Sequence, residues 1–150
     1  MKKSEPARAP DFIWPVRVYY EDTDAAGVVF YANYLKFMER ARTEWLAALG
    51  FALPAFERDH GVVFVVHRCE IDFHLPARLN DDLVVTVEGV HRGASRLVAR
   101  QEVRREDAVL TQALVTLACL DATRWRPVRM IPRNVLSRHA QIAFALLWSA

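Results

Sequence analysis

The sequence predicts an α+β domain in which a five-stranded antiparallel sheet curls around one long helix, with a short helix at the C-terminus. Three observations predict this fold class. The hydrophobic periods follow the order strand, helix, four strands and a final helix. Short turns join the last strands, so neighbouring strands should be antiparallel. The long helix has a broad apolar face, and a sheet is the only predicted surface large enough to bury it.

The length and composition indicate one globular domain. The chain has 150 residues, of which 53% are hydrophobic and 25% are charged, with a formal net charge of +2. These values exclude a disordered chain, which needs low hydrophobicity and high net charge. No apolar run is long enough to span a membrane, and the N-terminus lacks the apolar core of a secretory signal. We expect a disordered segment over 1–12, a single domain over 13–150, a cytoplasmic location and no stable membrane insertion.

The first half of the chain predicts one strand and one helix. Residues 13–22 alternate between apolar and polar side chains, and Pro15 favours the edge or the start of a strand. After a turn-forming DTDAAG, apolar residues recur at helical spacing for about 16 residues. Asn33 is a candidate N-cap for this helix, and Gly50 is a candidate C′ glycine. Residues 50–61 are expected to be a connector with one short helical turn.

Four strands and a helix are predicted in the second half, over 62–75, 83–91, 96–104, 109–120 and 134–148. The run 109–120 is almost continuously apolar, which is typical of a strand buried on both faces. The odd-numbered residues of 62–75 form one apolar face that includes His67, interpreted as a core or interface histidine. Cys69 and Cys119 are interpreted as buried thiols in a reducing compartment, without the spacing of a zinc site.

The charges are unevenly distributed along the chain. No acidic residue follows Asp121, so residues 122–150 carry +5 and residues 1–121 carry −3. A basic tail suits a phosphate-bearing partner, but no nucleic-acid-binding motif accompanies it, and we expect no nucleic acid partner. Four arginines are expected to share one strand face, which is either a solvated face or a phosphate contact: Arg92, Arg96, Arg100 and Arg104.

The stretch between the first strand and the helix concentrates groups that can do chemistry. Glu21, Asp22 and Asp24 precede Gly27 and the start of the helix. A helix start offers unpaired N–H groups that polarise a carbonyl, and a carboxylate facing it can act as base or nucleophile. This combination suits acyl transfer. The three acids also have non-catalytic interpretations. Asp24 could close an Asx-turn, and Asp22 could be exposed at a strand end. The acids could also bind a cation, although their spacing is not that of a calcium loop.

The stretch VRVYYEDTDAAGVVFYANYLKFMERARTEWL resembles the signature of hotdog-fold thioesterases of the 4-hydroxybenzoyl-CoA thioesterase family. It is most similar to the bacterial acyl-CoA thioesterases associated with the Tol–Pal system. The similarity continues through VVFVVHRCEIDFHLPARLNDDLVV, HRGASRLVARQEV and LVTLACLDATRWRPVRMIP, so it covers about residues 13–133. The resemblance implies a hotdog fold, in agreement with the order of the predicted elements.

The resemblance also implies residue roles. Asp24 corresponds to the catalytic aspartate, which attacks the thioester or activates water. Tyr31 lies at the helix entrance, where the family polarises the thioester carbonyl with a backbone N–H; many Tol–Pal-type members carry histidine at this position. Four further residues correspond to the acyl-pocket loop and the start of the helix, and are expected to bind substrate: Gly27, Val28, Asn33 and Tyr34.

The turn between the third and fourth predicted strands corresponds to the place where the family binds coenzyme A. Arg92, Ser95 and Arg96 are therefore expected to bind substrate, with Arg124 and Arg126 as weaker candidates. The predicted function is hydrolysis of an acyl-CoA, with no cofactor and no metal. An acyl carrier protein is a further candidate partner, and a homodimer or homotetramer is expected. The alternatives are a non-catalytic module that binds acyl-CoA or acyl carrier protein, and a hotdog dehydratase.

Overall fold

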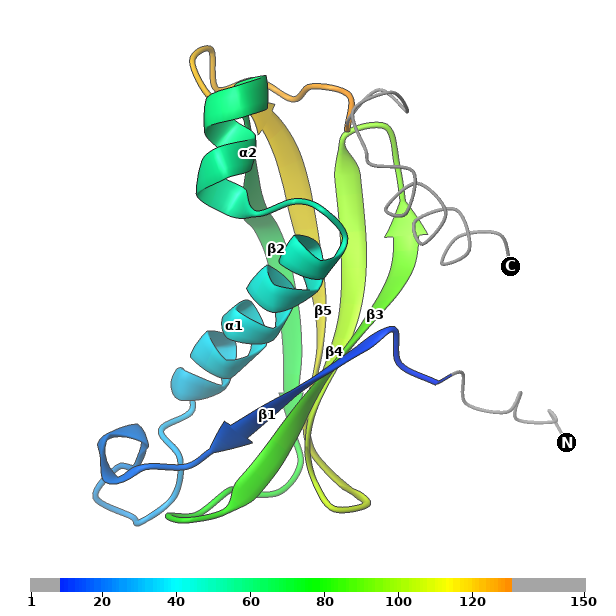
Figure 1. Cartoon of the computed structure of the whole chain (residues 1–150). Coiled ribbons are helices and arrows are strands. Elements are labelled where there is room, and N and C mark those ends of the chain that lie inside the picture. Colours follow the sequence, from blue (N-terminus) through cyan, green and yellow to red (C-terminus); the bar gives the residue numbers. More distant parts are fainter. Residues whose placement is uncertain (1–8, 131–150) are drawn as a thin grey trace, which may run out of the picture.

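The computed structural model describes residues 9–130, and its architecture confirms the predicted fold class. Five antiparallel strands form one sheet in the order β1-β3-β4-β5-β2. The long helix α1 crosses the front of this sheet, and the shorter helix α2 covers its upper end (Figure 1). The element bounds are β1 Phe12–Arg17, α1 Asn33–Ala48, α2 Leu53–His60, β2 Val62–Phe73, β3 Asp82–Arg92, β4 Arg96–Arg105 and β5 Ala108–Asp121. The helix expected over 134–148 lies outside the described residues.

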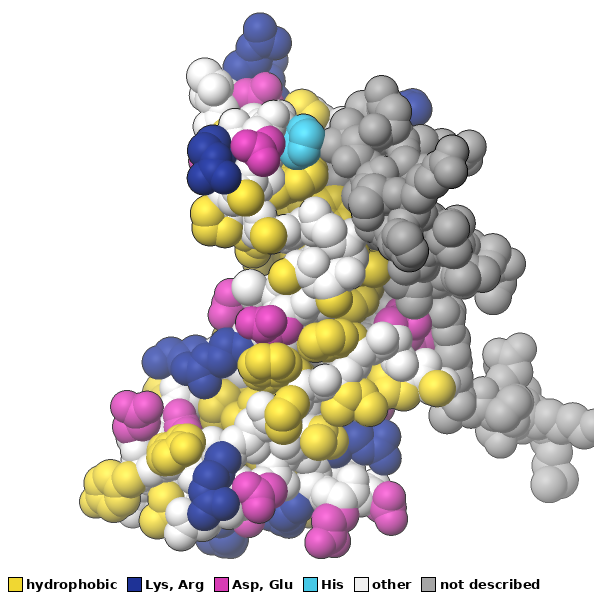
Figure 2. Space-filling model, viewed as in Figure 1, with side chains coloured by type: hydrophobic (Ala, Val, Ile, Leu, Met, Phe, Trp, Pro, Cys, Tyr) yellow, Lys and Arg dark blue, Asp and Glu magenta, His cyan; other side chains and the backbone are white. Residues whose placement is uncertain are grey.

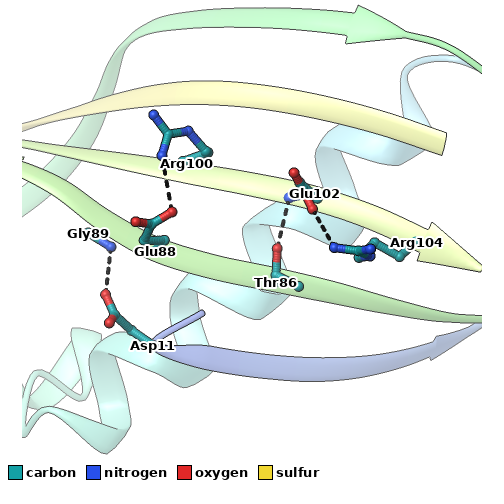
Figure 3. Close-up of polar contacts among 7 residues, drawn as sticks. All are labelled: Asp11, Thr86, Glu88, Gly89, Arg100, Glu102 and Arg104. Carbon is teal, nitrogen blue, oxygen red and sulfur yellow. Dashed lines mark hydrogen bonds and ion pairs between the residues drawn. The ribbon is translucent and has the colours of Figure 1, made fainter. Parts of the chain in front are cut away.

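Strand β1 starts and ends earlier than the sequence predicts. β1 begins at Phe12, and the preceding Asp11 is fixed to β3, because its N–H donates to the Val87 carbonyl and its carboxylate accepts the N–H of Gly89 at 2.8 Å (Figure 3). At the other end, the chain leaves the sheet for a 3-10 turn over Tyr20–Asp22. The Asp22 carboxylate closes this turn by accepting the N–H of Tyr19 at 2.9 Å. A side chain that satisfies local backbone donors thus replaces the ladder expected up to residue 22.

Helix α1 has the predicted extent, but its N-terminus is built differently. The N-cap position falls on Ala32, and Asn33 is the first helical residue, so the prediction that Asn33 is the N-cap is wrong. The Asn33 side chain donates instead to the Asp22 carbonyl at 3.0 Å. Gly50 has a φ of +96° immediately after the C-cap Leu49, which confirms it as the C′ glycine.

The connector over 50–61 is more helical than expected, because α2 spans eight residues. Pro54 lies in its first turn, where its missing N–H costs no hydrogen bond. Phe56 is buried and makes ring contacts with Phe51 and Phe64. This aromatic cluster attaches α2 to β2.

Helix α1 leaves the edge strand β2 less covered than the rest of the sheet. It packs against β1, β3 and β4, and its side chains Phe37, Met38 and Trp45 are buried in the core. The side chains of β5 that face α1 are buried as well, whereas residues 66–70 of β2 are exposed. Two predictions are wrong for the described chain: Cys69 is exposed rather than buried, and the outward face of β5 is only partly buried, with Leu114 exposed. His67 is exposed and so is not a core residue, which leaves the interface alternative as a prediction.

A β-bulge explains why the odd-numbered residues of β2 do not share one face. The register of β2 against β5 shifts between Val66 and Arg68, which leaves His67 without a ladder partner. Before the bulge, Val65 pairs with Ala118 on the outer face; after it, Cys69 pairs with Val115 on the face toward α1. A bulge inserts one extra residue, so it exchanges the faces of all residues that follow.

A buried polar pair crosses the core beneath α1. Arg42 is only 7% exposed, and its guanidinium donates to Oε1 of the fully buried Gln101 at 2.8 Å. Gln101 in turn donates to the Met38 carbonyl at 3.0 Å. Burial lowers the pKa of the Arg42 guanidinium, while the neighbouring Glu39 and Cys69 act in the opposite direction. The pair therefore attaches α1 to β4 at one defined position.

We expect Gln101→Leu to lower the free energy of unfolding by about 2–3 kcal/mol, because a buried charged donor loses its acceptor. The double variant Arg42→Met/Gln101→Leu should recover most of this loss, since it removes both polar partners. Urea unfolding of the single and double variants measures both values. Equal destabilisation by the two would contradict the pairing.

Candidate functional site

The site predicted between β1 and α1 is a tight hairpin that presents Asp24 at its tip. Thr23 and Val29 form an isolated antiparallel bridge at its base. The Asp24 N–H donates to the Val28 carbonyl at 2.9 Å, and the Gly27 N–H donates to the Asp24 carbonyl at 3.0 Å. Gly27 has a φ of +77°, a conformation that favours glycine, and open space surrounds it. The backbone conformation of this hairpin therefore depends on glycine at position 27.

The Asp24 side chain both closes a local turn and remains accessible. Its Oδ1 accepts the N–H of Ala26 at 2.8 Å. This contact forms the Asx-turn that the sequence analysis gives as an alternative role of Asp24. Its Oδ2 makes no hydrogen bond with any residue from 9 to 130, and the residue is exposed. One oxygen thus fixes the orientation of the carboxylate, and the other is available to a ligand.

The neighbouring acids have other roles. The Asp22 carboxylate is engaged by the Tyr19 N–H, and Glu21 is exposed to solvent. Over residues 9–130, no three His, Cys, Asp or Glu side chains are grouped so that they could hold a metal ion. In the same part of the chain, no helix is both long enough and apolar enough to cross a membrane.

The hairpin is held against the start of α1 through the Asp22 carbonyl. This oxygen accepts two hydrogen bonds, from the Phe30 N–H at 2.9 Å and from Nδ2 of Asn33 at 3.0 Å. The backbone N–H of Tyr31 donates no hydrogen bond to the rest of the described chain. The structure therefore places a free N–H at the helix entrance on the same rigid loop as Asp24.

A second loop, over residues 76–81, supports the hairpin from its other side. The Val29 N–H donates to the Ala77 carbonyl at 2.9 Å, and the Ala77 N–H donates to the Tyr34 hydroxyl at 3.0 Å. Burial raises the pKa of the Tyr34 hydroxyl, although the Ala77 hydrogen bond and the charge of Arg105 act to lower it. The polar groups of Asn33 and Tyr34, which the sequence assigns to substrate binding, are thus engaged in holding the loop.

An ion pair that the sequence analysis missed fixes this second loop. Asp81 accepts a hydrogen bond from Arg105 at 2.7 Å and another from the Arg78 N–H at 2.8 Å. Burial acts to raise the pKa of Asp81, but these two hydrogen bonds and the charge of Arg105 outweigh it, so the pKa is lowered. In the sequence, Asp81 belongs to the polar stretch NDD over 80–82, which was interpreted only as the end of a strand and not as part of an ion pair.

Aromatic and aliphatic side chains surround the helix entrance. Tyr31 is 65% exposed and its ring contacts Phe30 and Phe73. Hydrophobic side chains gather over this face of the molecule, between scattered charges (Figure 2). An open groove of about 330 Å³ begins one helical turn further on, lined by Leu35, Lys36, Glu39, Arg42, Val66, Cys69 and Val115. The surface beside Asp24 is therefore suited to an apolar ligand.

The predicted coenzyme A residues lie far from Asp24 within one chain. The turn between β3 and β4 is at the upper end of the sheet, and the Asp24 hairpin is at the lower end (Figure 1). Arg96 pairs with Ala118 on the outer face, whereas Arg92 pairs with Leu97, which faces α1. The prediction that Arg92 shares a face with Arg96, Arg100 and Arg104 is wrong, because Arg92 is in β3 beyond a bulge between Gly89 and His91.

Comparisons with known proteins agree with this fold. The model of the Thioesterase superfamily matches residues 26–112, and the chain belongs to this family. It is 40% identical over 131 residues to the acyl-CoA thioester hydrolase YbgC of Escherichia coli O157:H7. The aligned region covers 87% of this chain and 96% of that protein. It is 42% identical over 124 residues to the acyl-CoA thioesterase YbgC of Haemophilus influenzae, covering 83% and 90%. The prediction of a thioester hydrolase is confirmed at the level of the family.

Solved structures show the same architecture. A probable thioesterase from Bartonella henselae superimposes with a TM-score of 0.74 at 31% identity, over 79% of this chain and 98% of that one. A DHNA-CoA thioesterase from Staphylococcus aureus gives a TM-score of 0.80 at 19% identity, over 92% and 91% of the two chains. The second similarity concerns the fold alone. The resemblance to hotdog thioesterases is confirmed.

We expect Asp81→Asn to destabilise the protein by about 0.5–1 kcal/mol near neutral pH, since the variant keeps the acceptor for Arg78 but loses the charge facing Arg105. A lowered folded-state pKa contributes stability above the unfolded value, and that contribution is lost as pH falls through the folded value. The difference between wild type and variant should therefore shrink as pH falls below about 4. Urea unfolding across this range measures it; a constant difference would contradict the charge interaction.

Proposed function

We propose that the protein hydrolyses the thioester of an acyl-CoA to a free acid and coenzyme A. The observation that supports it best is the pairing, on one braced hairpin, of an accessible Asp24 carboxylate oxygen with a free backbone N–H at the entrance of α1. Relatives at 40–42% identity that carry this activity in their names support the same reaction.

In this mechanism the thioester carbonyl oxygen accepts a hydrogen bond from the Tyr31 N–H at the positive end of α1. In one route Asp24 takes a proton from the attacking water, the carbon–sulfur bond breaks, and Asp24 returns that proton to the leaving thiolate of coenzyme A. In the other route Asp24 adds to the carbonyl carbon and the carbon–sulfur bond breaks to leave an acyl anhydride on Asp24. Water then hydrolyses this anhydride, and its proton goes to the thiolate. No step needs a metal or a cofactor.

Substrate contacts follow from the positions of the remaining site residues. Gly27 and Val28 shape the loop beside the acyl group, and Asn33 and Tyr34 hold that loop in place as well as bordering the substrate. Ser95 and Arg96 bind the phosphates of coenzyme A from the outer face of the sheet, whereas Arg92, on the opposite face, is a separate candidate contact. Arginine suits this role because its planar fork matches phosphate oxygens.

In a homo-oligomer, the Asp24 hairpin of one copy and the β3–β4 turn of another can contact the same substrate molecule. Strand β2 is a 12-residue edge strand, and the groove beside it leaves Val66 52% exposed. Long, apolar edge strands seldom remain uncovered. A second copy that pairs with β2 in antiparallel fashion brings its upper end toward the lower end of the first copy, and so its β3–β4 turn toward Asp24. The two free cysteines suit a cytoplasmic location, and an acyl carrier protein is a further candidate partner.

We expect Asp24→Asn to lower kcat by about 100-fold or more with a panel of acyl-CoA substrates, because the general base or nucleophile is lost. Folding should be unaffected, since the Asn side-chain oxygen still accepts the Ala26 N–H. Glu21→Gln is the matched control, because it removes a neighbouring exposed carboxylate and should change kcat less than about twofold. Added chelator should leave the wild-type rate unchanged.

Equal rates for wild type and Asp24→Asn would contradict the role of Asp24. Tight binding of acyl-CoA by the wild type without turnover would instead indicate the non-catalytic binding module.

We expect Val66→Glu to convert the oligomer to a 17.2 kDa monomer, because it places a charge in the apolar groove beside β2. Ile13→Glu is the matched control, since Ile13 is equally exposed but lies on β1, the opposite edge of the sheet. Sedimentation velocity measures both. A wild-type monomer, or dissociation by Ile13→Glu alone, would contradict an interface at β2.

A further inference from the structure

The ion pair between Arg105 and Asp81 connects the end of β4 to the loop over 76–81, which supports the Asp24 hairpin. All three segments lie at the lower end of the sheet (Figure 1). We propose that Arg105 is a positioning residue for the proposed hydrolysis: it fixes this loop, and through the loop it fixes Asp24. The effect on kcat rests on the proposed function, whereas the effect on the hairpin does not depend on any reaction.

A single guanidinium nitrogen joins the two ends of the loop. Nη1 of Arg105 donates to Oδ2 of Asp81 at 2.7 Å and to the Pro76 carbonyl at 3.3 Å. Pro76 and Asp81 are the first and last residues of the loop, so one side chain bridges both ends. Arg105 is itself fixed, because it is the last residue of β4 and pairs with Ala108 across the turn. The ion pair therefore attaches the loop to the sheet.

The loop contacts the hairpin as a short stretch of antiparallel sheet. Arg78 forms an isolated antiparallel bridge with Val28, and the Val29 N–H donates to the Ala77 carbonyl at 2.9 Å. The Val28 carbonyl also accepts the Asp24 N–H at 2.9 Å. A continuous series of contacts thus leads from the ion pair, through the backbone of the loop, to the residue that carries the proposed base.

Removal of Arg105 leaves a carboxylate that the loop keeps largely out of solvent. The Asp81 side chain is 23% exposed, and burial acts to raise its pKa, whereas the Arg105 guanidinium acts to lower it. A partly buried carboxylate without its cation gains free energy by moving toward water. Because Asp81 also accepts the Arg78 N–H, such a movement displaces the backbone that contacts the hairpin.

The adjacent acid, Asp82, provides a comparison within the same chain. Its carboxylate pairs with Arg17 of β1 at 3.2 Å. The side chain of Asp82 is 82% exposed, so water can replace a lost partner at little cost. The two pairs carry the same charges and differ in burial, which makes Arg17→Met the matched control for Arg105→Met.

Amide hydrogen exchange of the full chain, followed by NMR, tests the effect on the hairpin. In Arg105→Met, we expect exchange of the Val29 N–H to accelerate at least about fivefold more than that of the core Met38 N–H, because Val29 bonds directly to the loop. Arg105→Lys should restore the wild-type ratio within about twofold. Both bonds come from one nitrogen, and a lysine ammonium has three donors. Arg17→Met should leave the ratio unchanged.

Kinetics with octanoyl-CoA measure the consequence for the proposed reaction. Arg105→Met should lower kcat about tenfold and change KM less than about twofold, since a misplaced carboxylate affects the transition state more than substrate binding. Arg105→Lys should recover kcat to within about threefold of the wild type, and Arg17→Met should change it less than about twofold.

The proposal is overturned by an unchanged exchange ratio or an unchanged kcat in Arg105→Met, by equal changes in Arg17→Met, or by a lowered kcat that Arg105→Lys does not recover. A wild type without turnover contradicts the proposed hydrolysis instead, and the exchange ratio then decides whether Arg105 fixes the hairpin. If Arg105→Met does not fold, Asp81→Asn replaces it in both measurements, because it removes the same charge interaction from the other side.

Discussion

The apolar face of α1 is buried against β1, β3 and β4, and this packing sets the positions of the other elements. Phe37, Met38 and Trp45 fill the space between the helix and these strands. Burial of this apolar surface is the main source of stability that a domain of this size has available. Because the contacts of the helix are concentrated on these three strands, the edge strand β2 is left partly exposed, with an open groove beside it.

The buried Arg42–Gln101 pair makes this helix position specific. Hydrophobic packing alone tolerates small shifts of a helix along a sheet, whereas a buried guanidinium has to find its acceptor. The Gln101 amide contacts both Arg42 and the Met38 carbonyl, so the rotation and the height of α1 are set together. The start of α1 is fixed by the same means, and the hairpin that carries Asp24 is built on that start.

The site is held in place by backbone groups together with two side chains of α1. Hydrogen bonds join the hairpin, the helix and the loop over 76–81. The carbonyls of Asp22 and Ala77 accept some of them, and the Ala77 N–H donates another. Asn33 and Tyr34 complete these contacts from within the helix. A carboxylate held in this way loses little entropy when substrate binds, which is the physical basis of preorganised catalysis.

Several features could be predicted from the sequence: the fold class, the extent of α1, the C′ role of Gly50, and the location of the candidate chemistry between the first strand and the helix. These features depend on local patterns: hydrophobic period, turn residues and the φ that only glycine adopts easily. Only the tertiary structure decided the faces of β2 and β3, because single-residue bulges at His67 and Val90 reverse the alternation without a sequence signature. It also decided the exposure of Cys69, the pairing of Asp81 with Arg105 and the separation of Arg92 from Arg96, since each depends on which strands lie side by side.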